Sequence, residues 1–163
     1  MMNEILVLTT GGTIDKQYFD ALSQYAITDS VIARLLETGR VAHPFRIEEV
    51  MRKDSLEIGD EDRDALAGRI EASANARIVI THGTDTMTET AARLARIPGK
   101  TMVLVGALAP ARFAESDATF NLGMAFATAQ VAPPGVYITM NGSVFRGDKV
   151  VKDREAGRFV AVE

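Results

Sequence analysis

The chain has 163 residues, which fits one domain with a core large enough to fold without disulfides or metal, and it contains no cysteine. Without cysteine, a disulfide framework is excluded. The 18 basic and 22 acidic residues give a net charge of −4, and because they form no basic cluster, a nucleic-acid partner is disfavoured. The apolar run at residues 5–8 is too short for a signal peptide or a membrane span, so we expect a cytoplasmic protein with no membrane partner.

Five short runs rich in β-branched residues are predicted to be strands. All but the second are almost continuously apolar, which is typical of strands that are buried on both faces of a parallel sheet. In chain order the runs are EILVLT (4–9), FRIEEV (45–50), ARIVIT (76–81), KTMVLVG (100–106) and GVYITM (135–140).

Four segments with helical spacing of apolar residues lie between these runs. Acidic residues 60–62 favour a helix start there, the pattern Thr86 to Glu89 resembles a capping box, and Pro133-Pro134 ends the last helix. The apolar positions that mark the four helices are Val31, Ile32, Leu35 and Leu36; Leu66, Ala67, Ile70 and Ala74; Ala91, Leu94 and Ala95; and Phe120, Met124, Ala127 and Val131.

This alternation predicts a single α/β domain over residues 1–163: a doubly wound, flavodoxin-like, mainly parallel sheet of about five strands with helices on both faces. Two short β-like runs around a polar turn at 154–157 predict a hairpin in the tail. Ligands of such sheets bind beyond the carboxyl ends of the strands, near the point where the strand order reverses.

Polar residues gather at those predicted strand ends. The first strand runs into Gly11-Gly12-Thr13, the second is followed by Asp54-Ser55, the third by residues 81–85, and the fifth leads through Asn141 to Lys152. Two adjacent glycines at a strand end indicate a tight turn or a close approach of another group. If the fold is right, these loops share one crevice.

A phosphate site fits this pattern poorly, because GGTIDK has neither of the usual phosphate-loop spacings and Asp15 would repel an anion. A metal site is disfavoured because the chain has only two histidines, His43 and His82, and no cysteine. We therefore expect no cofactor and no metal. For His82 a hydrogen-bonded, structural histidine at a strand end is preferred over a catalytic one.

The hydroxyl groups suggest a different chemistry. A threonine becomes a nucleophile when a neighbouring base removes its proton, and Thr, Asp and Lys at adjacent strand ends supply the parts of such a relay. An adjacent Asp85 favours the charged form of a lysine, so the relay needs burial or bound substrate to tip the balance.

These residues resemble the bacterial-type L-asparaginase family in two signature segments, T-G-G-T-I at 10–14 and H-G-T-D-T-M at 82–87. Further similarity covers nearly the whole chain: VGALAP at 105–110 is similar to the family's V-G-A-M-R-P, FNL at 120–122 recurs in the following helix, and MNGSVFRGDKVVK at 140–152 resembles the segment that ends in the family's catalytic lysine.

The resemblance implies an amidohydrolase that cleaves the side-chain amide of asparagine, and of glutamine to some extent, through a threonyl ester. It puts Thr13 in the place of the primary nucleophile and Thr84, Asp85 and Lys152 in the places of the second, charge-relay group. A tyrosine beside the nucleophile is also implied; Tyr25 is favoured and Tyr18 competes. The implied substrate-binding residues are Asp54, Ser55, Gly12, Gly83 and Ala107.

The departures from the family concern the substrate. Leu56 stands where some members have glutamine, and Ala109 replaces the arginine of V-G-A-M-R-P. The second domain of full-length members is expected to be absent, and with it an acidic group that binds the substrate amino group. We expect a homodimer or higher homo-oligomer with a small-molecule amide substrate. An amidohydrolase for another amide and a ligand-binding module without turnover stay open as alternatives.

Overall fold

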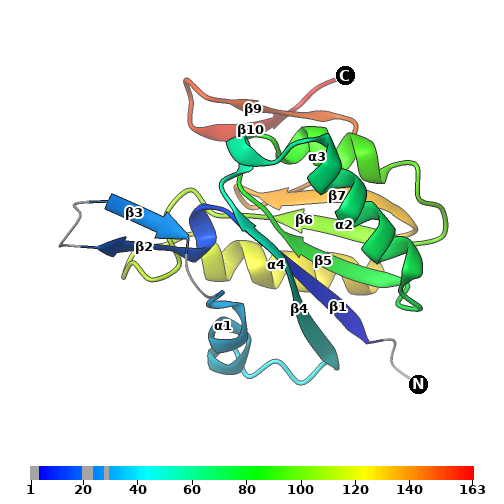
Figure 1. The fold of residues 1–163 in the computed structure, drawn as a ribbon, viewed down its shortest axis with the longest axis horizontal. Coiled ribbons are helices and arrows are strands. Elements are labelled where there is room, and N and C mark those ends of the chain that lie inside the picture. Colours follow the sequence, from blue (N-terminus) through cyan, green and yellow to red (C-terminus); the bar gives the residue numbers. More distant parts are fainter. Residues whose placement is uncertain (1–3, 20–23, 28–29) are drawn as a thin grey trace.

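The computed structural model describes residues 4–19, 24–27 and 30–163, with backbone only at 18–19 and 24–27. Its centre is a six-stranded sheet (Figure 1). In spatial order the strands are β4 (Phe45–Lys53), β1 (Ile5–Gly11), β5 (Arg77–Thr81), β6 (Thr101–Val105), β7 (Gly135–Met140) and β8 (Ser143–Arg146). The first five run parallel, which confirms the predicted strands and their doubly wound order.

Helices cover both faces of this sheet, as Figure 1 shows. Leu6 and Leu8 of β1 point into a core shared with α2 (Asp60–Ala72) and α3 (Met87–Leu94). Ile5 and Val7 point to the opposite core, which is shared with α1 (Ile32–Thr38) and α4 (Ala118–Val131). Alternate residues of one strand thus fill two cores, which explains its continuous apolar run.

Three smaller elements complete the fold. The predicted tail hairpin is confirmed as β9 (Val150–Asp153) paired antiparallel with β10 (Arg158–Ala161). A second hairpin, β2 (Lys16–Phe19) with β3 (Gln24–Ile27), was not predicted from the sequence. Strand β8 was missed as well. Asn141 and Gly142, both with positive φ, form the tight turn between β7 and β8 that an Asn-Gly pair favours in hairpins.

Several expected details of the helices are wrong. The residues that marked the fourth helix lie on its outer side: Phe120 is 66% and Val131 83% exposed, and the buried side is made of Ala118, Leu122, Ala125 and their neighbours.

Two further expectations fail at helix ends. Ala74 lies beyond the end of α2. Thr86 does not cap α3 with its side chain; its hydroxyl donates to the carbonyl of Ser55 at 2.7 Å. The acidic start of α2 is confirmed, since the Asp62 carboxylate accepts a hydrogen bond from the amide of Gly59 at 3.0 Å.

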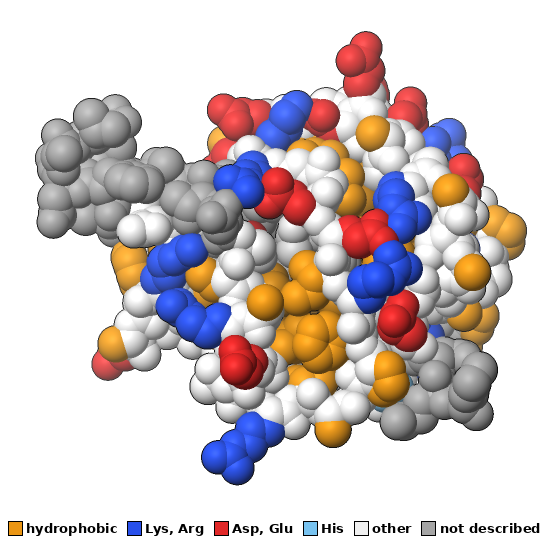
Figure 2. All heavy atoms as spheres, turned by 60° about the horizontal axis from the view of Figure 1, so that its bottom comes forward, with side chains coloured by type: hydrophobic (Ala, Val, Ile, Leu, Met, Phe, Trp, Pro, Cys, Tyr) orange, Lys and Arg blue, Asp and Glu red, His pale blue; other side chains and the backbone are white. Residues whose placement is uncertain are grey.

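The face that carries α1 and α4 has an apolar hollow. Its volume is about 140 Å³, and Leu35, Val41 and Phe126 are among the residues that line it. Figure 2, in which the bottom of Figure 1 comes forward, shows hydrophobic side chains gathered in the middle of this face. In the part of the chain that the structure describes, no helix has both the length and the apolar character needed to cross a bilayer.

Candidate functional site

The two glycines at the end of β1 adopt conformations that other residues rarely take. Gly11 has a φ of 98° and Gly12 a φ of 86°. A Cβ atom added to Gly12 would lie 2.5 Å from the backbone nitrogen of Gly83, at the end of the neighbouring strand β5. Only glycine permits this contact. The turn therefore brings Thr13, which is partly buried at the start of a short 3₁₀ helix (Thr13–Asp15), beside the loop after β5.

Gly83 makes an equally close approach to the loop after β4. A Cβ on Gly83 would lie 2.7 Å from the Oγ of Ser55, the first residue of a second 3₁₀ helix (Ser55–Glu57). The Ser55 hydroxyl accepts a hydrogen bond from the amide of Asp85 at 3.2 Å and is almost fully buried. The ends of β1, β5 and β4 are thus packed into one cluster, as the sequence predicts.

Lys152 reaches this cluster from β9. Its Nζ donates to the Thr84 Oγ1 at 2.7 Å and to the Asp85 Oδ1 at 2.8 Å. Thr84 is buried, and the lysine and aspartate side chains are 17% and 34% exposed. The structure therefore brings together the three residues that the resemblance assigned to a relay. A second cation, Arg154, which was not foreseen, donates to the Asp85 carbonyl at 3.3 Å.

The hairpin that carries Lys152 is anchored from its partner strand. Phe159 lies opposite Lys152 in the β9–β10 register, is 3% exposed and packs in the core formed with α2 and α3. Its amide donates to the Asn141 Oδ1 at 2.8 Å. Asn141 at the end of β7 thus positions the lysine indirectly.

Asp54 forms an ion pair with Lys16 of β2, with the Lys16 Nζ 2.9 Å from Oδ2. Partial burial disfavours its charge, but hydrogen bonds from the Leu56 amide and from Lys16, together with the positive charge of Lys152, outweigh burial and hold the pKa of Asp54 below its ordinary value. Asp54 is therefore an ionised group at the edge of the cluster. Leu56 beside it is 68% exposed.

The loop after β6 is held by two residues at the start of α4. Ala107 is buried. The Asn121 carboxamide donates to the carbonyl of Gly106 at 3.0 Å, and the Asp117 carboxylate accepts from the amides of Leu108 and Ala109 at 3.0 and 3.1 Å. Asn121 belongs to the FNL segment, so this hydrogen bond gives that segment a physical role. Asp117 was missed, although an aspartate directly before a helix is a common sign of local backbone hydrogen bonding.

His82 is buried with both ring nitrogens satisfied. Nδ1 lies 2.7 Å from the carbonyl oxygen of Gly83, and Nε2 lies 2.8 Å from the Thr90 Oγ1. Burial lowers the pKa of His82 to about 4, the hydrogen bond to Gly83 opposes this, and the charge of Arg63 adds to the lowering. The preferred structural interpretation of His82 is confirmed.

Tyr18 and Tyr25 are backbone partners in the β2–β3 register. Their side chains lie outside the described part of the structure, so the choice between them stays a prediction. Within the described ranges, no group of three or more His, Cys, Asp or Glu residues is arranged to hold a metal ion.

Comparison with known proteins agrees with this geometry. The family model described as "Asparaginase, N-terminal" matches residues 4–160. The glutaminase-asparaginase of Pseudomonas fluorescens biotype A is 32% identical over 163 residues, covering 91% of this chain and 45% of that protein. A glutamyl-tRNA(Gln) amidotransferase component from Sulfolobus acidocaldarius is 32% identical over 172 residues, covering 92% of this chain and 37% of that protein.

A solved structure shows the same fold. The thermostable L-asparaginase from Thermococcus kodakarensis superposes with a TM-score of 0.86 at 29% identity, covering 97% of this chain and 51% of that one. The chain spans about half the length of the curated relatives that it matches. By the extent of the family match and of the shared fold, the chain belongs to the asparaginase family.

Proposed function

We propose that the chain hydrolyses the side-chain amide of L-asparagine to aspartate and ammonia. The observation that carries the proposal is the position of Lys152, whose Nζ lies 2.7 Å from the Thr84 Oγ1 and 2.8 Å from the Asp85 Oδ1. One lysine ammonium thus contacts both a buried hydroxyl and a carboxylate at the edge of the sheet. They are the groups that a proton relay needs.

Thr13 is the nucleophile in this proposal. Its hydroxyl attacks the amide carbon of the substrate, the C–N bond breaks, and a threonyl ester forms. The hydroxyl proton leaves with the amide nitrogen as ammonia. Thr13 and Thr84 directly follow two glycines whose backbones touch, which supports a site where both hydroxyls face one substrate.

The second half reaction uses a water molecule. Water attacks the ester carbon, the bond to the Thr13 oxygen breaks, aspartate leaves, and the threonine regains its proton. Lys152 and Thr84 are the groups that move the proton away from the attacking water, and Asp85 keeps the lysine in place. Backbone amides in the packed loops stabilise the negative oxygen that develops in both steps.

The charged ends of the substrate need partners of opposite sign or hydrogen-bond donors. Asp85 is proposed to bind the ammonium group, which requires it to share its carboxylate with Lys152 and Arg154. Ser55, which is almost fully buried, is proposed to donate to the carboxylate. Asparagine and glutamine differ by one methylene, worth about 1–3 kcal/mol, so some glutaminase activity is expected.

A second candidate is an amide on a larger substrate. Leu56, next to Ser55, is 68% exposed and offers an apolar side chain beside the site that a larger substrate could contact. A component of a glutamyl-tRNA(Gln) amidotransferase is among the relatives, which supports this class of substrate.

Ammonia release from a panel of amides tests the proposal. The panel contains asparagine, glutamine, an asparagine substituted at its α-nitrogen and an asparagine-containing peptide, all with a free side-chain amide that yields ammonia, each with the wild-type chain and with Thr13→Ala. Release from asparagine that disappears in the variant supports the first candidate. Release only from the larger amides supports the second, and no release from any amide contradicts both and leaves a binding module.

A further inference from the structure

A buried chain of hydrogen bonds runs from α2 to the loop that carries Thr84. The Arg63 Nε donates to the Thr90 Oγ1 at 3.1 Å, the same oxygen lies 2.8 Å from the His82 Nε2, and the His82 Nδ1 lies 2.7 Å from the Gly83 carbonyl oxygen. Arg63, Thr90 and His82 are 6%, 0% and 1% exposed. Water therefore does not compete for these bonds.

The chemistry of its two ends fixes the direction of this chain of hydrogen bonds. A guanidinium group only donates, so the Thr90 hydroxyl must accept from Arg63, and because a buried neutral ring with its proton on Nδ1 has a lone pair on Nε2, the Thr90 proton points at the His82 Nε2. A carbonyl oxygen only accepts, so the His82 Nδ1 must carry the ring proton. His82 is held as one neutral tautomer from both sides.

We propose that Arg63 and Thr90 are positioning residues of the site: through His82 they hold the Gly83 carbonyl, and with it the peptide that presents Thr84 to Lys152. The inference deepens the proposed function and rests on it. Gly83 packs between the Ser55 side chain and the Gly12 backbone but has no side chain of its own, so the hydrogen bond to its carbonyl is the polar contact that sets the rotation of its peptide. A small rotation of this peptide would move the Thr84 Oγ1 away from the Lys152 Nζ.

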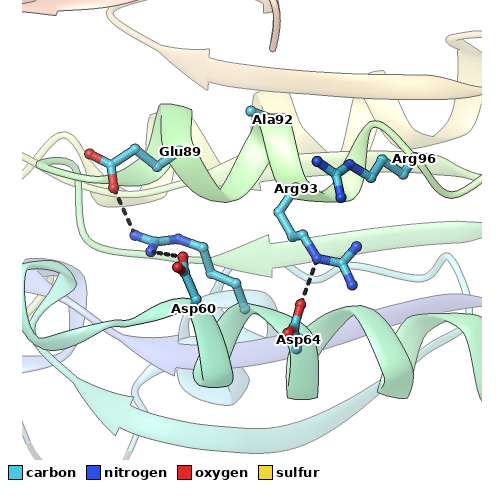
Figure 3. Close-up of a pocket in the computed structure, with 7 residues that line it drawn as sticks. Asp60, Asp64, Glu89, Ala92, Arg93 and Arg96 are labelled. Carbon is cyan, nitrogen blue, oxygen red and sulfur yellow. Dashed lines mark hydrogen bonds and ion pairs between the residues drawn. The ribbon is translucent and has the colours of Figure 1, made fainter.

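The contacts of Arg63 with exposed carboxylates are weaker than its buried hydrogen bond to Thr90. Arg63 also contacts Glu89 at 3.2 Å and Asp60 at 3.7 Å, but those side chains are 64% and 102% exposed. They border an open groove of about 550 Å³ between α2 and α3, in which Figure 3 shows Glu89 and Arg93 on one helix and Asp60 and Asp64 on the other. Ion pairs at such exposure contribute little, so the bond to Thr90 is the contact that orients the arginine.

The first test reads the tautomer of His82 without any turnover. The protein has only two histidines, so nitrogen NMR of the ring signals is assigned by comparison with His43→Gln. We expect a neutral His82 ring protonated at Nδ1 in the wild type and in Thr90→Ser. A ring protonated at Nε2 overturns the inference, whatever the enzyme does.

The second test separates positioning from folding. Thr90→Val removes the hydroxyl at similar volume, Thr90→Ser keeps it, and Thr128→Val is the control, a buried threonine of α4 that takes no part in these hydrogen bonds. We expect Thr90→Val to lower kcat on the order of tenfold or more, with KM within about twofold, because small misplacements of a reacting group have large effects. Thr90→Ser should recover most of kcat, and Thr128→Val should not change it.

The outcomes also distinguish the inference from the proposed function. If the wild type releases ammonia and Thr90→Val keeps its full kcat, the inference is wrong and the proposed function stands. If the wild type hydrolyses no amide, crystal structures of the two Thr90 variants decide the inference alone. It then predicts that the contact between Lys152 and Thr84 is lost in Thr90→Val and kept in Thr90→Ser, and an unchanged contact in both contradicts it.

Discussion

The loops after β1 and β5, which carry Thr13 and Thr84 (the threonine loops), and the β9–β10 hairpin, which carries Lys152 (the lysine hairpin), are built in different ways. Gly12 and Gly83, at the ends of β1 and β5, are in backbone contact inside a sheet that is covered on both faces. Lys152 stands on β9, which belongs to a separate two-stranded sheet. That sheet is attached through a buried Phe159 and a hydrogen bond from its amide to Asn141.

This difference teaches where the site tolerates change. Atoms added in the threonine loops have nowhere to go, because protein interiors are close-packed, so fold and chemistry should fail together there. The hairpin depends on a few side chains, so its chemistry should be separable from the stability of the sheet. The following experiments can break or sharpen that contrast.

The largest effect is expected for Thr13→Ala. The substitution removes the proposed nucleophile but adds no atom to the glycine turn, so we expect kcat to fall on the order of 10⁴-fold or more while the melting temperature stays close to that of the wild type. Steady-state ammonia release and a thermal melt measure the two parts. Substantial activity in a folded variant would remove Thr13 from its role.

Lys152→Met should come next. It keeps the length of the side chain and removes the proton-carrying group, so we expect a loss of kcat on the order of 10³-fold with a much smaller change in KM. Lys149→Met, at an exposed position before the same strand, is the matched control. Equal effects of the two substitutions would show that Lys152 acts only through the charge of the hairpin.

Gly12→Ala tests the other side of the contrast. The new Cβ would meet the Gly83 backbone nitrogen at 2.5 Å, and φ at 86° is unfavourable for alanine. We expect the free energy of unfolding to fall by about 3 kcal/mol, measured by urea denaturation. The control is Gly59→Ala, where a Cβ meets nothing within 4 Å. A stable, active Gly12→Ala chain would contradict the close packing of the two strand ends.

The stability of the β5 end should depend on pH through His82. Its pKa of about 4 in the folded chain lies below the ordinary value of 6.5, so the unfolded chain binds more protons in between. The contribution of His82 to the free energy of unfolding is therefore complete above pH 6.5. As the pH falls toward 4, the free energy of unfolding decreases by roughly 2–3 kcal/mol. Denaturation across this window, with an NMR titration of the ring, measures it. A His82 that titrates near 6.5 in the folded chain would refute the prediction.

The smallest effect is expected at Asn141. Asn141→Ala removes the oxygen that accepts from the Phe159 amide. It also places alanine at a φ of 53°, which asparagine tolerates better. We expect the free energy of unfolding to fall by about 1–2 kcal/mol. Asn141→Asp keeps an acceptor oxygen and should lose less. If hydrogen exchange of the β10 amides is the same in both variants, Asn141 does not anchor the hairpin.

The sequence predicted those parts of the fold in which burial dictates residue type. Strands buried on both faces need continuous apolar runs. The four runs of this kind, together with the less apolar run at 45–50, form the parallel strands. The outer stripe of α4 misled because apolar residues surround that helix, and the small residues that truly face the sheet carry a weaker signal. The β2–β3 hairpin was missed because its strands are only four residues long and carry no continuous apolar run.

At the site, the parallel sheet predicted that the polar strand ends share one edge, and the resemblance to the family assigned Lys152 to the same group as Thr84 and Asp85. The contacts of Lys16 with Asp54 and of Arg154 with Asp85 were not foreseen. They depend on where two hairpins place long side chains, and that placement leaves no local pattern. The roles of Arg63 and Thr90 were hidden for the same reason, because they lie on two helices and meet only after folding.

The central claim is that a threonyl ester forms on Thr13, and trapping that ester tests it most directly. Wild-type chain is mixed with asparagine, quenched in acid during turnover, digested and analysed by mass spectrometry. We predict a mass increase of one aspartyl group on the peptide that contains Thr13, absent in Thr13→Ala and enriched when Lys152→Met slows hydrolysis of the ester. An aspartyl group found on Thr84 or elsewhere, with Thr13 unmodified, would contradict the account.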